Sequence, residues 1–209
     1  MTIFYGRSPT NAKQHRMTLA EYLSYDDGSS TRYELEDGVL VEMGAESPIN
    51  TWIAIFLSFA FRDLGLPPYR FGIKHLIQVQ SSFVTARDPD LVIHSEESAI
   101  AFMDGRKESC LRLEDPDPLV VIEIVSPGSE SSDNYQRDYV RKPQEYAARG
   151  IPEMWQVDEA RAWVRVGQLV KGAYEFTTFQ GDEILISPTF PSLQLTVETI
   201  LRAGQRSPH

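Results

Sequence analysis

The alternation of apolar and polar positions along the chain predicts a mixture of helices and strands. Over residues 48–64, apolar side chains recur three and four residues apart, which predicts an amphipathic helix. Shorter runs that alternate, or that are continuously apolar, predict strands. These runs cover residues 32–36, 39–43, 71–80, 90–94, 118–127, 154–158, 162–166, 174–179 and 183–186. Helices and strands interspersed in this way predict an α/β or α+β fold, with a mixed sheet flanked by helices.

Residues with special backbone preferences mark the ends of several predicted elements. Thr18-Leu19-Ala20-Glu21 has the capping-box pattern and predicts the start of a short helix. Asp37-Gly38 lies between two alternating runs and predicts a tight hairpin turn. Ser47-Pro48 predicts a helix start, with serine as the cap and proline in the first turn. Gly150 predicts the end of a later helix, and residues 197–201 form the last predicted helix.

Length and hydropathy place these elements in one domain. The chain has 209 residues, of which 42% are hydrophobic and 24% charged, a balance typical of globular domains. We expect an N-terminal arm over residues 1–17, a domain over 18–201 and a tail over 202–209. No apolar run approaches the roughly 18 residues of a membrane-spanning helix. The N-terminal sequence also lacks the pattern of a secretory signal, so we expect a cytoplasmic protein.

The charge balance and the single cysteine limit the binding and catalytic functions to be expected of the chain. The formal net charge is −10, whereas proteins that bind nucleic acid tightly usually carry a basic surface. Cys110 excludes an intrachain disulfide and fits a reducing compartment. This thiol is either a nucleophile or an ordinary small residue, half-buried or on the surface. Its sequence neighbours provide no base, which favours the second interpretation.

Glu123 is the residue that most needs an explanation. It lies inside Val-Val-Ile-Glu-Ile-Val, the most strand-like segment of the chain, which reads as a central strand covered on both faces. Burying a carboxylate there costs free energy unless a metal ion or a cation compensates it. The alternatives are that Glu123 points out of a half-exposed strand, or that it pairs with a lysine or an arginine.

Asp90 supplies a possible partner for Glu123. It follows Pro89 at the start of another predicted strand. A carboxylate at the start of one strand and a second in the middle of a neighbouring strand can lie a few ångströms apart. Two carboxylates and a backbone carbonyl suit Mg²⁺ or Mn²⁺, which keep several waters. Such a metal activates bound water and stabilises charge on a transferring phosphoryl group.

Three further sets of residues have weaker signals. Asp138, Lys142 and Tyr146 stand four residues apart and share one face of a predicted helix, either as a surface ion pair or as a face directed at the carboxylates. Glu34 precedes the hairpin turn, and its position alone predicts a solvent-facing strand residue. The four histidines show no metal-ligand spacing. His94 lies four strand positions from Asp90, on the order of 13 Å away.

The ordered series of motifs resembles a known family. The motifs are Arg-Tyr-Glu34-Leu-x-Asp-Gly, Ser47-Pro48, Pro89-Asp90-Leu-Val, Val-Val-Ile-Glu123-Ile-Val-Ser126-Pro127, Asp138-x-x-x-Lys142-x-x-x-Tyr146 and Gly150-Ile-Pro152-Glu-x-Trp155-x-Val-Asp158. In this order they resemble the Uma-two family of restriction-endonuclease-like proteins, assigned to the PD-(D/E)XK nuclease superfamily. The resemblance covers roughly residues 18–201.

The resemblance implies a restriction-endonuclease-like fold and a metal site. Asp90 would match the Pro-Asp carboxylate of the superfamily and Glu123 the acidic ligand that follows it. The backbone carbonyl of Ile124 would be a further metal ligand, and Glu34 would join the site from the N-terminal part. Lys142 would match the catalytic lysine, moved onto the neighbouring helix.

The chain departs from the superfamily pattern around this lysine. The pattern places a lysine two residues after the glutamate, where this chain has Val125. The role therefore passes to Lys142, and because Pro143 follows it, we expect Lys142 at a kink or near a helix start.

Two functions remain open from the sequence. The first is a Mg²⁺- or Mn²⁺-dependent endonuclease that hydrolyses DNA, with Asp90, Glu123 and Lys142 as its catalytic residues. The second is a non-catalytic interaction or regulatory module that keeps the nuclease-like fold, which the net charge of −10 favours. Cutting two DNA strands would suit a homodimer.

Overall fold

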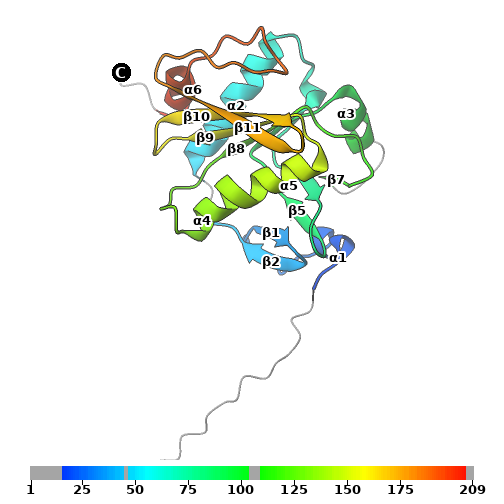
Figure 1. Cartoon of the computed structure of the whole chain (residues 1–209). Coiled ribbons are helices and arrows are strands. Elements are labelled where there is room, and N and C mark those ends of the chain that lie inside the picture. The colour runs from blue at the N-terminus through cyan, green and yellow to red at the C-terminus, as the bar shows by residue number, and fades with distance from the viewer. Residues whose placement is uncertain (1–15, 45–46, 104–108, 206–209) are drawn as a thin grey trace, which may run out of the picture.

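The computed structural model describes residues 16–44, 47–103 and 109–205 and is a mixed α+β structure (Figure 1). It contains two β-sheets with helices packed against them. The mixed α+β class expected from the sequence is confirmed, but the strands form two sheets where the sequence predicts one. The helices are α1 (Leu19–Leu23), α2 (Pro48–Asp63), α3 (Glu96–Met103), α4 (Asp133–Tyr135), α5 (Lys142–Arg149) and α6 (Val197–Ala203), with a 3-10 turn η1 (Pro68–Arg70) and a π-helical segment η2 (Gln136–Arg141).

The larger sheet has six strands in the order β11-β10-β9-β8-β6-β3. Their bounds are β3 (Phe71–Gly72), β6 (Leu91–Ile93), β8 (Val120–Ile124), β9 (Glu153–Asp158), β10 (Trp163–Val170) and β11 (Ala173–Gln180). The central strands β8 and β9 pair in parallel, and the other neighbours pair antiparallel. The sheet is therefore mixed, and β8 lies in its middle.

The smaller sheet has the order β2-β1-β5-β4-β7 and lies beside α5 in Figure 1. Its strands are β1 (Tyr33–Glu36), β2 (Val39–Glu42), β4 (Leu76–Val79), β5 (Thr85–Arg87) and β7 (Cys110–Leu111). The predicted hairpin turn joins β1 to β2. Asp37 and Gly38 have φ angles of 50° and 80°, the left-handed conformation that an Asp-Gly hairpin turn requires.

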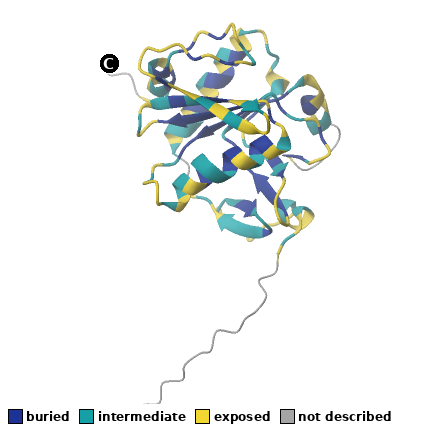
Figure 2. Cartoon of the chain, viewed as in Figure 1, coloured by how far each residue is buried: buried dark blue, intermediate teal, exposed yellow. Residues whose placement is uncertain are grey.

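The core explains why β8 is apolar at every position except Glu123. Every residue of β8 is buried, because α2 covers one face of the larger sheet and α5 the other (Figures 1 and 2). Ile122 packs in the cluster that contains α2, and Val121 packs in the cluster that contains Tyr146 of α5. Since side chains alternate along a strand, Glu123 is on the same face as Val121, toward α5.

Two strand predictions differ from the structure, and two short strands were missed. The predicted strand over 71–80 is two strands in different sheets, because the chain bends at Lys74, whose φ is 61°. The predicted strand over 183–186 is only an isolated bridge between Ile184 and Thr196. Prolines at positions 188 and 191 follow this run and cannot donate ladder hydrogen bonds, which limits any extension of the pairing beyond it. The short strands β5 and β7 were not predicted from the sequence.

The helical segment that ends at Gly150 is also more complex than predicted. Gly150 adopts the expected left-handed conformation, with a φ of 101°. Before it, however, the chain passes from α4 through the π-helical η2 into α5, and the N–H of Lys142 donates to the carbonyl of Arg137, five residues earlier. Pro143 has no N–H to donate, which disfavours a regular α-helical ladder at this point.

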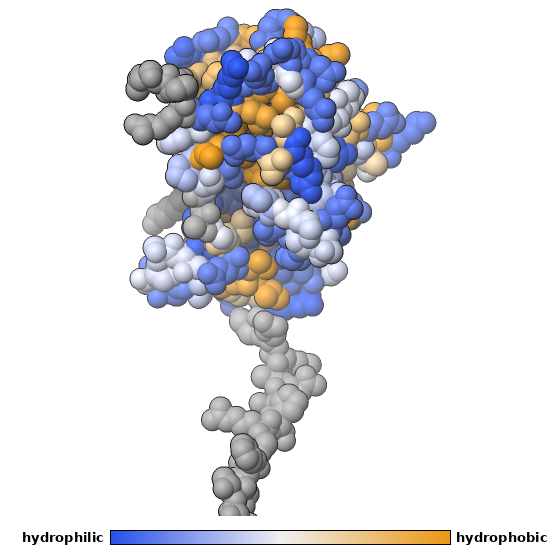
Figure 3. Space-filling view, turned by 90° about the vertical axis from the view of Figure 1, so that its left-hand side faces the viewer, coloured by the Kyte–Doolittle hydropathy of each residue, from blue (hydrophilic) through white to orange (hydrophobic). Residues whose placement is uncertain are grey.

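The surface carries exposed apolar side chains among many charged ones. Trp52, Ile55 and Phe59 of α2 are exposed. Figure 3 shows a largely hydrophilic face, with hydrophobic residues exposed in its upper part and again near its lower end. Within the described part of the chain, no helix combines the length and the hydropathy needed to cross a membrane.

Candidate active site

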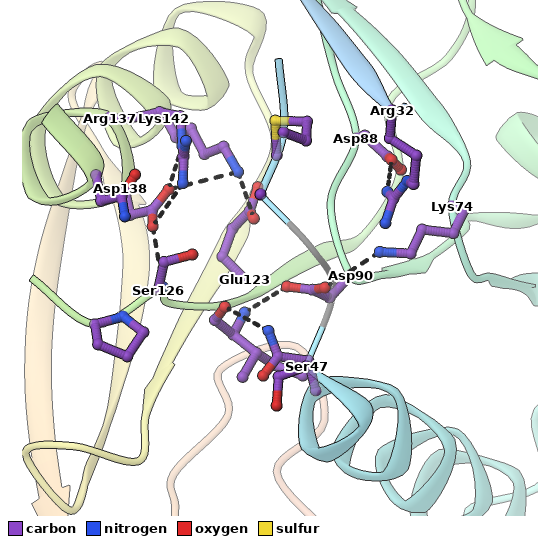
Figure 4. A pocket seen from close by; sticks show the side chains of 16 residues that line it. Arg32, Ser47, Lys74, Asp88, Asp90, Glu123, Ser126, Arg137, Asp138 and Lys142 are labelled. Carbon is purple, nitrogen blue, oxygen red and sulfur yellow. Dashed lines mark hydrogen bonds and ion pairs between the residues drawn. The ribbon is translucent and has the colours of Figure 1, made fainter. Parts of the chain in front are cut away.

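A pocket of about 190 Å³ lies where the end of β8, the first turn of α2 and the η2–α5 segment meet (Figure 4). Four of the residues predicted for the site line it, namely Asp90, Glu123, Ile124 and Lys142. Ser126 lines it too. The structure thus brings together residues that lie up to 52 positions apart in the sequence (Asp90 to Lys142).

Glu123 lies in the wall of this pocket that faces α5. Its side chain is only 4% exposed. Its Oε2 accepts a hydrogen bond from Lys142 Nζ at 2.7 Å, and its Oε1 accepts one from the hydroxyl of Tyr146 at 2.7 Å. Burial raises the pKa of Glu123 to about 7, although the Lys142 ammonium acts in the opposite direction. The structure therefore excludes a solvent-facing Glu123 and confirms an ion pair.

Lys142 is surrounded by carboxylates. Besides Glu123, its Nζ lies 3.7 Å from Glu34 and 3.7 Å from Asp138. Burial by itself would lower the pKa of Lys142, but these three acids raise it well above its usual range. The side chain therefore stays an ammonium ion. Its position as the first residue of α5, directly after η2, matches the expected helix start and directs it at Glu123.

Asp90 connects two strands at the opposite side of the pocket. It immediately precedes β6, and its Oδ2 accepts the backbone N–H of Ile124 at 2.7 Å. This bond ties the start of β6 to the end of β8, which are antiparallel neighbours. Its Oδ1 lies 3.4 Å from Lys74 Nζ. In Figure 4, Asp90 and Glu123 approach the pocket from different sides.

Glu34 lies behind Lys142 and is not among the residues that line the pocket. It is fully buried in β1, with one oxygen 3.1 Å from Arg87 Nη1 and the other accepting the N–H of Asp88 at 3.1 Å. Burial opposes ionisation, but Lys142 and Arg87 keep the pKa of Glu34 below its usual value. Its contact with Lys142 positions the lysine, and its role as a metal ligand stays a prediction.

Several charged residues of the pocket were not predicted from the sequence. Asp88 pairs with Arg32, Lys74 approaches Asp90, and Arg137 comes from η2. Asp88 could have been predicted from its position two residues before Asp90, because residues two apart on an extended chain project to the same side. No sequence pattern predicts Arg137, because its position depends on the π-helical turn.

The charges lining the pocket balance. The four cations are Arg32, Lys74, Arg137 and Lys142, and the four carboxylates are Asp88, Asp90, Glu123 and Asp138. Although the chain has a net charge of −10, the pocket itself is formally neutral. It can accept a cation and an anion together without a large net charge.

The donors of the pocket fit a hydrated divalent cation. Within residues 16–44, 47–103 and 109–205, no group of three or more His, Cys, Asp or Glu side chains is arranged to hold a metal ion. Mg²⁺, however, usually binds through one or two carboxylates and keeps several waters, and Asp90, Glu123 and the Ile124 carbonyl offer oxygens of the type it prefers. Asp88, whose Oδ1 is buried without a hydrogen-bond partner in the described part of the chain, adds a further carboxylate to the same pocket.

Other candidate residues lie outside the pocket. Cys110 is buried, and burial raises the pKa of its thiol to about 11, which favours the ordinary structural interpretation over a nucleophile. His94 lies beside His75, with ring nitrogens 3.0 Å apart, and contacts Ser98 at 3.2 Å. Neither histidine is among the pocket residues.

The fold and the pocket define a restriction-endonuclease-like α+β protein. The chain belongs to the Uma2 family, whose model, described as "Putative restriction endonuclease", matches residues 19–198. It is similar in structure to a putative nuclease belonging to DUF820 from Anabaena variabilis ATCC 29413, with a TM-score of 0.69 and 17% identity, covering 90% of this chain and 99% of that chain. No curated protein matches it. The family and fold expected from the sequence are confirmed.

Proposed function

We propose that this protein is a Mg²⁺- or Mn²⁺-dependent endonuclease that hydrolyses phosphodiester bonds in DNA. One observation carries the proposal, which is that Asp90, Glu123, Ile124 and Lys142 all line one pocket. Membership of a family described as "Putative restriction endonuclease" supports it. Asp90, Glu123 and the carbonyl of Ile124 would hold the metal, with Glu34 supporting the site through Lys142.

A divalent metal at these donors would polarise the phosphate and lower the pKa of a bound water. The residues of the chain supply the remaining functions. Lys142 remains protonated, so it stabilises developing negative charge and orients the attacking water. Tyr146 and Lys142 hold the Glu123 carboxylate in one orientation. Asp90 is held by the N–H of Ile124, so the two carboxylates are fixed before substrate arrives.

The charge balance makes DNA a reasonable substrate for an acidic chain. A neutral pocket that gains a divalent cation becomes locally positive and attracts a phosphate. The remaining negative surface lowers affinity over distances on the order of the Debye length, about 10 Å at 0.1 M salt. Binding should therefore be weak unless the metal is present.

The decisive experiment is a plasmid-nicking assay with 5 to 10 mM MgCl₂ or MnCl₂ (on the order of the millimolar affinities of weak metal sites) and with EDTA as the blank. We expect nicking by the parent and its loss in Asp90→Asn. Asp63→Asn is the matched control, because Asp63 is exposed on α2 and lies outside the pocket. If the parent does not nick, or if Asp90→Asn nicks as well as the parent, the proposal is wrong.

A second candidate function is a non-catalytic interaction or regulatory module. It is favoured by the fact that both oxygens of Glu123 are already bonded to Lys142 and Tyr146. A module of this kind would keep the pocket as a structural ion-pair network. Calorimetric titration with MnCl₂ separates the two candidates, because absence of binding at millimolar Mn²⁺ together with absence of nicking supports the module.

We also propose a homodimer for the nuclease, because two copies place one active site at each strand of a duplex. Light scattering coupled to size-exclusion chromatography measures the mass in solution. A mass near twice 23.7 kDa supports the dimer, and a mass near 23.7 kDa with active nicking contradicts it.

A further inference from the structure

The π-helical segment places two consecutive residues, Arg137 and Asp138, in the same pocket wall. Both are buried, with residue exposures of 7% and 3%, and both line the pocket. The wider turn of a π-helix changes the direction of side chains relative to an α-helix, and such turns occur often at functional sites. A buried arginine at this position is not needed by the reaction scheme above, so its role requires its own explanation.

The guanidinium of Arg137 is held rigidly from one edge. Its Nε donates to Asp138 Oδ1 at 2.9 Å, and its Nη2 donates to Asp138 Oδ2 at 3.3 Å. Asp138 is fixed in turn, because its Oδ2 accepts the N–H of Ser126 at 3.2 Å and its carbonyl accepts Gln156 Nε2 at 2.7 Å. Arg137 Nη1 makes no hydrogen bond to any residue in the described part of the chain.

The other three cations of the pocket form ion pairs with carboxylates. Lys142 lies among Glu123, Glu34 and Asp138. On the opposite wall Arg32 pairs with Asp88, and Lys74 approaches Asp90 (Figure 4). Arg137 therefore differs from them, because its single partner occupies one edge of the guanidinium and leaves the other edge to the pocket.

We infer that Arg137 binds a nonbridging oxygen of the substrate phosphate. This inference rests on the proposed nuclease function and identifies the group that recognises the phosphate. A guanidinium is planar, keeps its proton at any physiological pH and matches the geometry of phosphate oxygens. Asp138 fixes its plane before substrate binds, so little side-chain freedom is lost on binding. Arg137 contacts the phosphate on the wall opposite Asp90 and transfers no proton.

The test compares Arg137→Gln and Arg137→Lys with the parent. Arg137→Gln removes the charge, and Arg137→Lys keeps the charge but not the planar donor edge. Arg62→Gln is the matched control, because Arg62 is exposed at the far end of α2 and pairs with Asp63. Affinity for a 20-base-pair duplex is measured by fluorescence anisotropy in CaCl₂ at several salt concentrations, and nicking is measured in MnCl₂.

We expect Arg137→Gln to bind the duplex about 10- to 100-fold more weakly. The slope of log affinity against log salt should fall by about one, because one phosphate contact is lost. Arg137→Lys should keep the slope and lose part of the nicking rate, and Arg62→Gln should match the parent in both. Reduced stability does not change the salt dependence of DNA binding. A smaller slope therefore distinguishes a lost phosphate contact from a structural role of Arg137. Should Arg137→Gln fail to fold, Arg137→Lys still tests the inference, because it should keep the parental salt slope while nicking more slowly, and an unchanged nicking rate would overturn the inference.

The outcomes separate this inference from the proposed function. If the parent nicks and Arg137→Gln nicks and binds equally well, the inference is wrong while the nuclease function stands. If the parent binds without nicking and Arg137→Gln lowers the salt slope, the nuclease function is wrong while the phosphate contact stands. If the parent neither binds nor nicks, both are wrong.

Discussion

Two glutamates buried in neighbouring parallel strands have opposite surroundings. Glu153 begins β9, is fully buried and accepts hydrogen bonds from Trp155 Nε1 at 2.5 Å, from Ser187 Oγ at 2.7 Å and from the N–H of Thr189 at 2.8 Å. All three donors are neutral. Glu123, near the end of β8, instead meets an ammonium and a phenol and lines a pocket.

This difference shows what distinguishes a candidate active site from a structural carboxylate. Burial alone does not distinguish Glu123 from Glu153, because both side chains are buried to a similar extent. The deciding features are the charges near Glu123 and its access to a pocket. Glu153 is enclosed by a loop and the larger sheet, where its hydrogen bonds fasten residues 187–189 to the core.

The largest expected effect comes from replacing each glutamate by glutamine. We expect Glu123→Gln to lower metal-dependent nicking by about a thousandfold or more, because it removes the negative charge of a proposed metal ligand and the charged partner of Lys142. Glu153→Gln should keep the rate of the folded protein and lower the free energy of unfolding by about 1 to 3 kcal/mol. Nicking assays and urea titrations measure the two quantities.

Equal loss of rate in both variants would remove the distinction between the two glutamates. A normal rate in Glu123→Gln would show that Glu123 is a structural residue like Glu153. Circular dichroism of each variant confirms that the comparison is made between folded proteins.

The next effect is a difference in the pH dependence of stability. The pKa of Glu123 is raised from an ordinary 4.5 to about 7. Between these values the folded protein binds more protons than the unfolded chain, so the contribution of Glu123 to stability is present below about pH 4.5 and is lost as pH rises through about 7. Relative to Glu123→Gln, the parent should lose up to about 3 kcal/mol over this window.

Urea unfolding of the two proteins from about pH 4.5 to about pH 8, in the presence of EDTA, measures this difference. Parallel curves for the parent and Glu123→Gln would show that Glu123 titrates alike in the folded and unfolded chains. That result would contradict the strong desolvation inferred for the site.

The smallest expected effect is that of Tyr146→Phe. Its hydroxyl donates to Glu123 Oε1, so its loss should lower the free energy of unfolding by about 1 to 2 kcal/mol and the nicking rate by less than about tenfold. Tyr174→Phe is the matched control, because its hydroxyl donates to the carbonyl of Ile151 outside the pocket. The control should lose stability without losing rate, and a similar rate loss in both would exclude a specific role for Tyr146.

Part of the candidate site could be predicted from the sequence because its residues are unusual for their positions in the predicted strands. Glu123 interrupts an apolar strand, and Asp90 follows a proline at a strand start. The spacing from Asp138 to Lys142 and Tyr146 also indicated a shared helix face. The fold class could be predicted from the order of the elements. Strands and helices that are interspersed along a chain pack in only a few layered arrangements.

The rest depends on contacts that no local pattern records. The bend at Lys74 divides one apolar run between two sheets, which a periodicity of two cannot reveal. Arg137 reaches the pocket only because η2 is π-helical. Glu34 looked like a surface residue, yet β1 is covered and its carboxylate meets Arg87 and Lys142. These positions are set by how separate segments pack together.

The bend at Lys74 sets a local backbone strain against an ion pair at the pocket. A non-glycine residue with a left-handed backbone costs about 1 to 2 kcal/mol, and Lys74 has a φ of 61°. A glycine there would relieve this strain but would also remove the amine beside Asp90. Selection for heat resistance should therefore replace Lys74 by glycine only if the relieved strain exceeds the loss of its ion pair with Asp90.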